Sequence, residues 1–392
     1  MTSKKSLLAL NMCHILLDGL YDSIPVLLAI IVATQANADT IVGIVTSLVA
    51  LASTLAGLAT ISVSSRFNLM QATAIILFTG GAGFLVVAFS GGIWLIGLGF
   101  ILVALGQNIF HNMAFSFFTQ TTNRASLGRA ISNFTAVGDL GRIPLISLAS
   151  LIGAMSFNEI AGWRAASFGF GCINIVLFAI SYPTLFKKDN IASKVNSRPV
   201  RQLPNFGIVR DTKVFLTVLA NVLNTVSCGC LFAFLPLLLL SKGFPPKALA
   251  GFAFGFSIGC FVGKIACGRL IDRFGSRKVF MWAQGILSLL ICLLLVGDSF
   301  YYVVCVSLLI GIVTKGSVPI VQTLATEYVT SDKYDDIFSI NSFFRGTALI
   351  VIPLLFGFLA SAYGINLIYM IMAVVSCIAV IPIIAMSHVK QV

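Results

Sequence analysis

The feature that most constrains this chain is a succession of apolar stretches, each long enough to cross a membrane, that continues almost from end to end. They lie at approximately 8–33, 40–64, 69–89, 92–118, 128–154, 163–185, 214–240, 247–270, 278–297, 299–326, 336–360 and 365–387. A helix needs about 20 residues to cross the hydrocarbon core of a bilayer. Because helices satisfy their own backbone hydrogen bonds in lipid, we predict an all-α membrane protein with twelve transmembrane helices.

The composition excludes other common classes of protein. The 392 residues are 58% hydrophobic and only 10% charged, whereas soluble domains carry roughly 25% charged residues. A soluble globular protein, a disordered chain and a coiled coil are therefore excluded. A transmembrane β-barrel would show segments of about ten residues that alternate in polarity, and the sequence SFYYVVCVSLLIGIV at 299–313 does not alternate.

The placement of basic residues predicts the orientation in the membrane. If both termini are cytoplasmic, 18 Lys and Arg residues lie on the inner side, and three (Arg164, Lys242 and Lys247) lie outside. Cytoplasmic loops of membrane proteins carry such an excess. We therefore predict cytoplasmic termini, and we interpret most of the net charge of +12 as a topology signal rather than as a sign of nucleic-acid binding.

The chain divides into two similar halves. The longest polar segment, 187–213, carries seven basic residues and separates six predicted helices from six more. Ile143-Pro144-Leu145 is matched by Ile352-Pro353-Leu354 at an offset of 209, and Arg66-Phe67 is matched by Arg273-Phe274 at an offset of 207. Near-equal offsets indicate a duplicated bundle with parallel halves. The predicted domains are a six-helix bundle at 1–186, a basic cytoplasmic linker at 187–213 and a second six-helix bundle at 214–392.

One predicted helix, 247–270, carries a glycine at every fourth residue. Gly251, Gly255, Gly259 and Gly263 would form one smooth helical face. Such a face lets a neighbouring backbone approach closely in a membrane, so we expect this helix to pack tightly against another.

A loop motif resembles that of a known family. The segment GRLIDRFGSRK (Gly268–Lys278) is similar to the cytoplasmic loop signature of the major facilitator superfamily, roughly G-x-L-x-D-R-x-G followed by basic residues. The equivalent first-half loop has Ser65 in place of the expected Asp. Within the superfamily, NMCHILLDGLYDSIPVLL and NIFHNM resemble the fosmidomycin-resistance-type branch. A G-x-x-x-G-P pattern frequent in antiporters is replaced here by GDLGRIP at 138–144, which leaves antiport open.

The resemblance implies a fold and a mode of action. It implies two six-helix bundles in the major facilitator fold, alternating access, and a location in the plasma membrane, for this branch the bacterial inner membrane. It also implies that helices 1, 4, 7 and 10 line a central cavity. Gating is expected at Gly268, Asp272, Arg273, Gly275, Arg277 and Lys278, with Asp272 paired in only one conformation. The sequence has no catalytic constellation and no Walker-type loop, so we predict no enzyme activity and no cofactor.

Acidic side chains within the first predicted helix are candidates for proton transfer. Ionisable groups in transmembrane segments are costly and therefore point to function. His14, Asp18 and Asp22 are spaced by four residues and share one helical face, with Tyr21 beside it. Two carboxylates one turn apart in a low dielectric suit a proton carrier, so we predict proton coupling through these three residues. Salt bridges from these acids to other helices are the alternative.

Basic side chains within the helices point to an anionic substrate. Arginine and lysine bind carboxylate and phosphate groups, and four such residues against three acids predict a cationic cavity. The predicted substrate-binding residues are Arg142, Lys264, Lys315, Arg345, Tyr21, His111 and Asn108. Two alternatives stay open: Asp139, three residues before Arg142, neutralises it, or Lys264 extends to the cytoplasm while other cations pair with Asp18 or Asp22.

These features predict a monomeric secondary active transporter. Its expected substrate is a small organic anion that carries carboxylate, phosphate or phosphonate groups, a carboxylate siderophore or a metabolite for example, and its expected driver is the proton gradient. A broad-specificity drug efflux antiporter is the first alternative. A non-transporting membrane receptor or assembly factor is the second, and a divalent metal exporter that uses His14 and Asp18 is a third. We predict no resident metal and no nucleic-acid partner.

Overall fold

The computed structural model describes residues 4–121, 124–157, 160–185, 204–330 and 333–388. Some side chains within its helices, those of 124–133 and 315–319 among them, are outside this description. Its α-helices are α1 (Lys4–Val32), α2 (Ala38–Leu58), α3 (Thr60–Arg66), α4 (Leu69–Phe89), α5 (Ile93–Thr121), α6 (Arg124–Gly153), α7 (Gly162–Leu185), α8 (Thr212–Asn224), α9 (Leu231–Ser241), α10 (Leu249–Phe274), α11 (Ser276–Val296), α12 (Phe300–Thr326), α13 (Tyr334–Tyr363), α14 (Ile365–Ile378) and α15 (Val380–His388). A two-residue hairpin, β1 (Ser156–Phe157) and β2 (Ile160–Ala161), joins α6 to α7.

The described helices confirm the twelve predicted spans. Eleven helical segments are long and apolar enough to cross a membrane, and α12 contributes a further apolar stretch at Phe300–Thr314. Three predicted spans are interrupted. The span at 40–64 is divided between α2 and α3, the span at 214–240 contains a π-helical turn, and the span at 365–387 is divided at Ala379. The last break lies just before Pro382, which lacks a backbone N–H and falls in the first turn of α15, where that N–H would have no partner within the helix.

The helices form two compact units. Unit 1 contains residues 1–31 and 48–201, and unit 2 contains residues 32–47 and 202–392. The start of α2 therefore groups with the second half of the chain. A Cβ on Gly43 would lie only 2.8 Å from the Cα of Gly357 on α13, so these two helices approach each other through glycine. Of the predicted linker at 187–213, residues 187–203 lie outside the described part of the chain.

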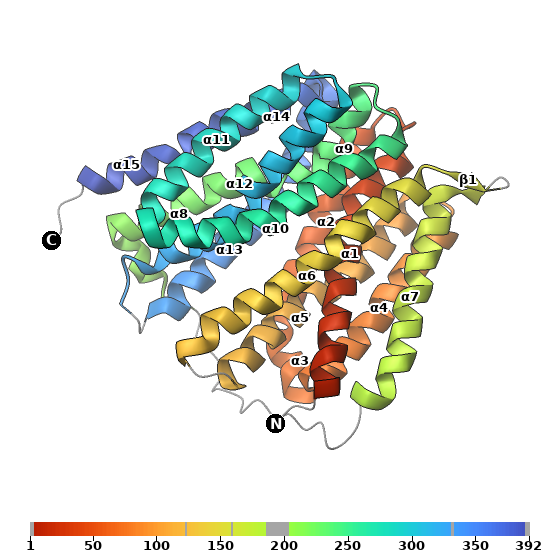
Figure 1. Cartoon of the computed structure of the whole chain (residues 1–392), viewed down its shortest axis with the longest axis horizontal. Coiled ribbons are helices and arrows are strands. Elements are labelled where there is room, and N and C mark those ends of the chain that lie inside the picture. Colours follow the sequence, from red (N-terminus) through yellow and green to blue (C-terminus); the bar gives the residue numbers. More distant parts are fainter. Residues whose placement is uncertain (1–3, 122–123, 158–159, 186–203, 331–332, 389–392) are drawn as a thin grey trace. The chain divides into compact units, whose positions relative to one another are not determined.

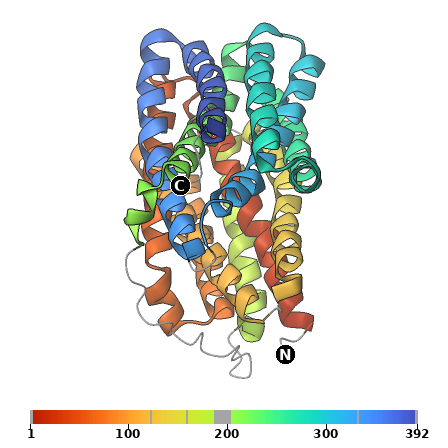
Figure 2. The ribbon, with the colours of Figure 1, turned by 90° about the vertical axis from the view of Figure 1, so that its left-hand side faces the viewer.

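The helices of unit 1 run alongside one another, from α1 in red to α7 in yellow-green (Figures 1 and 2). Close packing of α4 against α5 depends on two glycines. A Cβ on Gly83 would lie 2.5 Å from the carbonyl oxygen of Gly99, and the reverse distance would be 2.6 Å. Arg164 on α7 donates through Nη1 to the carbonyl of Ala88 at 2.8 Å, so the end of α4 is held by a side chain of α7.

In unit 2 the predicted glycine face packs α10 against α12. A Cβ on Gly255 would lie 3.1 Å from the carbonyl oxygen of Val304, and a Cβ on Gly259 would overlap the carbonyl oxygen of Leu308. Gly263 faces the backbone of Ile312 in the same way. The close approach expected from the four-residue glycine spacing is confirmed.

Unit 2 also buries a neutral polar network beside the π-helical turn at Thr225–Gly229. Gln284 on α11 donates through Nε2 to Asn224 Oδ1 at 2.6 Å. Its Oε1 accepts from the Ser376 hydroxyl at 2.7 Å and from the Ser227 hydroxyl at 3.4 Å. These side chains are all buried. Because buried polar groups need partners, this network joins α8, α11 and α14 without any charge.

Candidate functional site

The ionisable side chains of α1 meet those of α5 and α6 within unit 1. Two glycines of α6 allow this approach. A Cβ on Gly138 would collide with Asp18 and His14, and a Cβ on Gly141 would overlap the carbonyl oxygen of Ile15. The sequence GDLGRIP therefore brings the backbone of α6 directly against the polar face of α1, and Arg142 follows at the point of contact.

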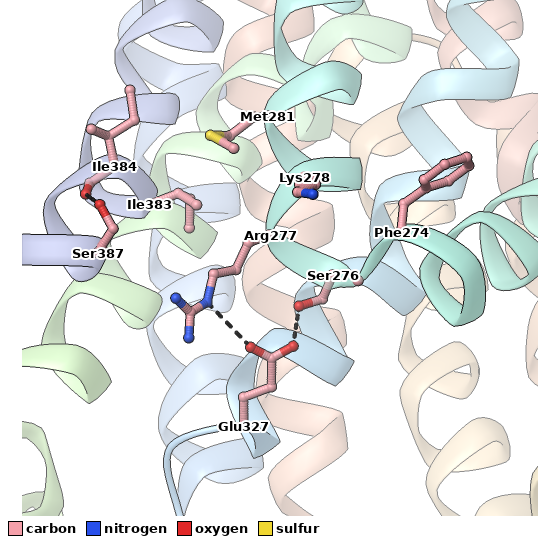
Figure 3. Close-up of a pocket in the computed structure, with 10 residues that line it drawn as sticks. Phe274, Ser276, Arg277, Lys278, Met281, Glu327, Ile383, Ile384 and Ser387 are labelled. Atoms are coloured by element: carbon pink, nitrogen blue, oxygen red, sulfur yellow. Dashed lines mark hydrogen bonds and ion pairs between the residues drawn. The ribbon is translucent and has the colours of Figure 1, made fainter. Parts of the chain in front are cut away.

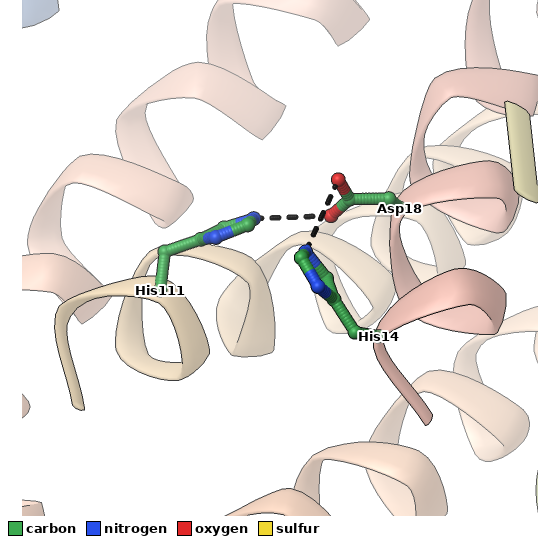
Figure 4. Close-up of side chains that lie close together, drawn as sticks. All are labelled: His14, Asp18 and His111. Atoms are coloured by element: carbon green, nitrogen blue, oxygen red, sulfur yellow. Dashed lines mark hydrogen bonds and ion pairs between the residues drawn. The ribbon is translucent and has the colours of Figure 1, made fainter. Parts of the chain in front are cut away.

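Asp18 lies at the centre of this cluster and is only 2% exposed. Its Oδ1 accepts from Gln107 Nε2 at 2.8 Å and lies 3.0 Å from His111 Nε2. Its Oδ2 accepts from Arg142 Nη2 at 3.2 Å and lies 3.4 Å from His14 Nε2. Four side chains from three helices thus surround one buried carboxylate (Figure 4 shows the two histidines).

Arg142 pairs with three carboxylates. Its Nε lies 2.6 Å from Asp22 Oδ2, its Nη2 contacts Asp18, and its Nη1 donates to Asp139 Oδ1. Asp139 is 1% exposed and the Arg142 side chain 12%. The sequence left open two alternatives for these charges. One paired Arg142 with Asp139, and the other joined the α1 acids to another helix by salt bridges. Contacts of both kinds are present.

His14 is fully buried in an aromatic environment. Its ring stacks on Phe134 with centroids 4.0 Å apart and an interplanar angle of 20°, and Phe110 and His111 lie at 5.2 Å. Within the described part of the chain neither ring nitrogen has a hydrogen-bond partner, although Nε2 points toward Asp18. The position of this imidazole is therefore fixed by packing.

The cluster has an excess of negative charge when its imidazoles are neutral. Asp18, Asp22 and Asp139 contribute three negative charges and Arg142 one positive charge, which leaves a net charge of −2. Two protons on His14 and His111 would bring it to zero. Arg142 therefore differs from the expectation of a cation open to an anionic substrate, because its charge is compensated within its own unit.

Three potential metal ligands occur in this cluster. One donor atom each from His14, Asp18 and His111 lie within 4.8 Å of one another, and imidazole with carboxylate suits several divalent metals. The guanidinium of Arg142 lies 3.2 Å from Asp18 Oδ2, however, so a bound cation would face a fixed positive charge. The group therefore fits a metal poorly. A proton needs only one acceptor atom and fits it better.

The other predicted substrate-binding residues are dispersed. Tyr21 is half-buried on α1, and Asn108 on α5 donates to the carbonyl of Ser53 at 2.8 Å, which connects α5 to α2. In unit 2, Lys264 on α10 is half-buried and Arg345 on α13 is exposed. Lys315 belongs to α12, but its side chain lies outside the described part of the structure. Of this predicted set, His111 and Arg142 are the residues whose described contacts meet at Asp18.

The loop with the family signature contacts the end of α12. Glu327 accepts from the Ser276 hydroxyl and lies 3.6 Å from Arg277 Nε (Figure 3). Gly275 has a φ of 81°, a conformation that favours glycine, so the motif glycine permits the turn between α10 and α11. Arg277 also covers the ring of Tyr328 at 5.1 Å, and burial raises the pKa of the Tyr328 phenol.

The remaining motif residues are solvent-accessible. Asp272, Arg273 and Lys278 are exposed and Gly268 is half-buried. Asp272 makes no ion pair with any other residue for which the structure gives a side chain. The adjacent cavity of about 400 Å³ is lined by Phe274, Gly275, Ser276, Arg277, Lys278, Met281, Glu327, Ile383, Ile384 and Ser387. Among the basic residues of the motif, Arg277 is the one that pairs with an acid in the part of the chain that the structure describes.

Comparison with known proteins decides the family. A model described as the Major Facilitator Superfamily matches residues 10–263 and 248–390. The chain belongs to the major facilitator superfamily. Its members are transporters and not enzymes, so the chain is a multi-pass membrane protein and a secondary transporter of a small molecule. The predicted fold of twelve transmembrane helices is confirmed.

Solved structures share this major facilitator fold at low sequence identity. A bacterial homolog of the human lysosomal transporter Spinster, in an inward-facing and unoccupied conformation, has a TM-score of 0.76 at 16% identity, over 99% of this chain and 98% of that chain. The nucleoside transporter NupG, as a point mutant, has a TM-score of 0.76 at 13% identity, over 97% of this chain and 99% of that chain. A search of curated proteins found no match.

Two residues of this major facilitator protein had not been assigned their contacts from the sequence. The sequence did not indicate that Gln107 donates to Asp18. Its position one helical turn before His111 is the signal that could have indicated this, because residues four apart share a helical face. Glu327 carries no distinguishing sequence signal, because it lies at a helix end, where a charged side chain is ordinary.

Proposed function

We propose that this transporter couples the movement of a small organic anion to the movement of protons. The observation that carries the proposal is the buried cluster around Asp18. It contains three carboxylates and two imidazoles around a single arginine. With its net charge of −2, the cluster gains electrostatically from each proton it takes up, because like charges repel strongly in a low dielectric.

Protonation can also alter how the helices pack. Asp18 and Asp22 belong to α1, whereas Arg142 and Asp139 belong to α6. Neutralising either α1 carboxylate removes a charge-assisted contact between these helices. Buried ion pairs of this kind are strongly destabilised when one partner loses its charge. Proton binding is thereby linked to a rearrangement of unit 1, which alternating access requires.

The proposed anion-binding residues are the cations of unit 2. Lys264, Lys315 and Arg345 each lie about ten residues or more from the nearest end of their helices. The acids of these three helices all lie near helix ends. A lipid-embedded cation is costly, and three in one unit favour a negatively charged substrate. Arg142, whose charge is already compensated, is assigned to proton coupling instead.

Transport by the purified protein in proteoliposomes tests both parts. We expect labelled citrate, glycerol 3-phosphate or fosmidomycin to be transported under an imposed pH gradient, and we expect nigericin, which collapses that gradient, to stop accumulation. Flux is measured in both directions, since import and export use the same cluster. Gradient-driven transport that nigericin leaves unchanged would remove the coupling proposal.

Variants and uncharged probes test the substrate class. Lys315→Ala and Arg345→Ala should each weaken binding of the anionic probe, whereas Lys247→Ala, near the start of α10, should not. Uridine serves as a neutral probe, chosen because one similar fold is that of a nucleoside transporter, and ethidium serves as a lipophilic cation. Transport of uridine or ethidium in preference to every anion would contradict an anionic substrate.

We also propose the bacterial inner membrane as the location, a monomer as the functional form, and the fosmidomycin-resistance-type branch as the nearest part of the family. The excess of basic residues on one side supports cytoplasmic termini. Fusions of a cytoplasmic and a periplasmic reporter to each terminus test the orientation. Gating is proposed for the Gly268–Lys278 loop, and its contact with Glu327 should break when the cytoplasmic side changes conformation.

A further inference from the structure

We propose that His111, oriented by Asp18 and Gln107, is the side chain that accepts the coupled proton, while Asp18 stays ionised as its counter-ion. This inference rests on the proposed proton coupling, and it reassigns the proton from the α1 carboxylates to α5. It follows from the hydrogen-bond roles that the three side chains can play.

The surroundings of Asp18 consist of donors. The amide nitrogen of Gln107 can only donate, and it lies 2.8 Å from Oδ1. The guanidinium of Arg142 can only donate, and it lies 3.2 Å from Oδ2. The Gln107 amide nitrogen offers no acceptor to a proton on Oδ1, so such a proton would have to be shared with His111 Nε2 at 3.0 Å, the position from which an imidazolium donates. The ionised carboxylate satisfies every one of these contacts.

The same roles fix the tautomer of His111. Its Nε2 lies 3.0 Å from Asp18 Oδ1 and 3.1 Å from Gln107 Nε2. Because the carboxylate accepts and the Gln107 amide is already directed at Asp18, the hydrogen on His111 belongs on Nε2. Its Nδ1 is then the basic nitrogen, and it makes no hydrogen bond to the residues that the structure describes.

Exposure separates His111 from Asp18 and His14, whereas Asp22, which is 19% exposed, has its Oδ2 held 2.6 Å from Arg142 Nε. The side chain of His111 is 20% exposed, compared with 3% for Asp18 and 0% for His14. A proton on His14 would place a cation between aromatic rings with no partner closer than 3.4 Å. A proton on His111 Nδ1 gives an imidazolium that donates through Nε2 to Asp18. The charged and titratable groups that face it are His14, Asp18 and Asp22 on α1 and Asp139 and Arg142 on α6.

Protonation simply adds one proton to Nδ1 and changes the net charge of the cluster from −2 to −1. The Asp18–His111 contact then becomes an ion pair between α1 and α5. Gln107 acts as a positioning residue, because its amide holds the carboxylate in place and presents the positive end of an N–H dipole near the imidazole. Removing that amide should therefore make the imidazolium easier to form.

Nuclear magnetic resonance of the imidazoles tests this without any substrate. The chain has only three histidines, His14, His111 and His388, so carbon-13-labelled histidine in nanodisc-embedded protein with a histidine-free affinity tag gives three signals. We expect the signal that His111→Gln removes to change from the neutral form with hydrogen on Nε2 to the doubly protonated form when the sample is acidified. A His111 signal that is unchanged by acidification would overturn the inference.

Gln107→Leu provides the positional test, and Gln284→Leu is its matched control. Both remove a buried amide, but Gln284 belongs to the neutral network of unit 2. We expect Gln107→Leu to move the His111 midpoint upward by about half a pH unit or more, because a nearby donor opposes the cation. Gln284→Leu should leave it in place. If Gln107→Leu has no effect, or if both variants have the same effect, the positioning role is wrong.

Transport separates failure of this inference from failure of the proposed coupling. Glutamine at 111 keeps a donor for Asp18 but cannot titrate, so His111→Gln should exchange labelled probe across the membrane yet fail to accumulate it against a gradient. Suppose that the wild type accumulates probe under a pH gradient, that His111→Gln does so with the same pH profile, and that Asp18→Asn does not. The proposed proton coupling then stands, but His111 is not the proton acceptor. If the wild type ignores the pH gradient, the proposed coupling itself fails.

Discussion

The two units bury polar groups in opposite ways. Unit 1 concentrates ionisable side chains around Asp18, whereas unit 2 joins the amides of Asn224 and Gln284 to serine hydroxyls beside a π-helical turn. Both arrangements connect three helices. Only the first contains groups that can gain or lose a proton near neutral pH.

This difference separates two uses of buried polarity. A neutral network, once satisfied, has the same energy over a wide range of pH and therefore specifies a fixed packing. Repulsion within a cluster of net charge −2 should fall with each proton that it gains, so we expect its packing to depend on the proton concentration. The two units are therefore predicted to differ in how their packing depends on pH.

Of the variants predicted here, Arg142→Leu should lower the free energy of unfolding the most. Arg142→Leu leaves Asp18, Asp22 and Asp139 without their shared cation, two of them almost fully buried. Breaking a buried ion pair in this way costs about 3–5 kcal/mol. We expect a corresponding fall in the free energy of unfolding, measured by denaturant titration in detergent at pH 8, and a smaller fall at pH 5, where protonation relieves the repulsion.

Arg164→Leu is the matched control for this variant. Arg164 donates to the carbonyl of Ala88 and covers the ring of Trp163 at 4.3 Å, so its removal deletes an arginine without isolating a carboxylate. Its effect should be smaller and the same at both pH values. Equal losses for the two variants, or a loss at Arg142 that does not depend on pH, would contradict the charged-cluster interpretation.

The second prediction concerns a variant that moves α6 away from α1 without altering any charged side chain. Gly141→Ala places a methyl group on the carbonyl oxygen of Ile15, so α6 must move away from α1. Inserting a methyl group into tight packing costs about 1–3 kcal/mol, and we expect the upper half of this range because the obstacle is backbone. Gly169→Ala, where an added Cβ meets nothing within 4 Å, should leave the thermal unfolding midpoint unchanged or slightly raised. A similar midpoint for both variants would show that the α1–α6 contact is looser than described.

The third prediction breaks the neutral network of unit 2. Gln284→Leu removes the side-chain hydrogen bonds to Asn224 Oδ1 and to the Ser376 hydroxyl, and it leaves Asn224 Oδ1 with the weak donor of the Cys228 thiol at 3.0 Å. An unsatisfied buried polar group costs about 1–3 kcal/mol, and the Ser376 hydroxyl retains a 3.0 Å contact with the Gln284 carbonyl, so we expect about 1–2 kcal/mol. The loss should be the same at pH 5 and pH 8 in the denaturant titration. A clear pH dependence would show that unit 2 also contains a titrating group.

The contrast between the units also shows what a sequence can predict here. Hydropathy alone determined the number of transmembrane helices, because a bilayer admits few structures for a long apolar segment. The spacing of His14, Asp18 and Asp22 predicted a polar face on α1. Partners across helices depend on packing that no single-helix periodicity contains, so the triple pairing of Arg142 remained one of several possibilities.

Glycine positions could have narrowed that uncertainty. Gly138 and Gly141 bracket Asp139 and immediately precede Arg142, which marks the polar stretch of α6 as a site of close approach. Considered with the acids of α1, this spacing would have favoured a compensated cluster over a cationic cavity. Residue types by themselves gave the charges but not their distances, and the distances decide whether a buried cation is open to a substrate.

The smallest expected effect belongs to a charge pair that is not buried. Glu327→Gln keeps an acceptor for the Ser276 hydroxyl but removes the negative charge that faces Arg277, and the Glu327 and Arg277 side chains are 32% and 43% exposed. Exposed pairs contribute about 0.2–1 kcal/mol and weaken as salt screens them. We therefore expect a loss in this range at low ionic strength that diminishes in 1 M NaCl, by the same denaturant titration, whereas the loss for Arg142→Leu should persist in salt. If Glu327→Gln destabilised the protein as much as Arg142→Leu did, burial would not be the property that distinguishes the cluster of unit 1 from other charges in the molecule.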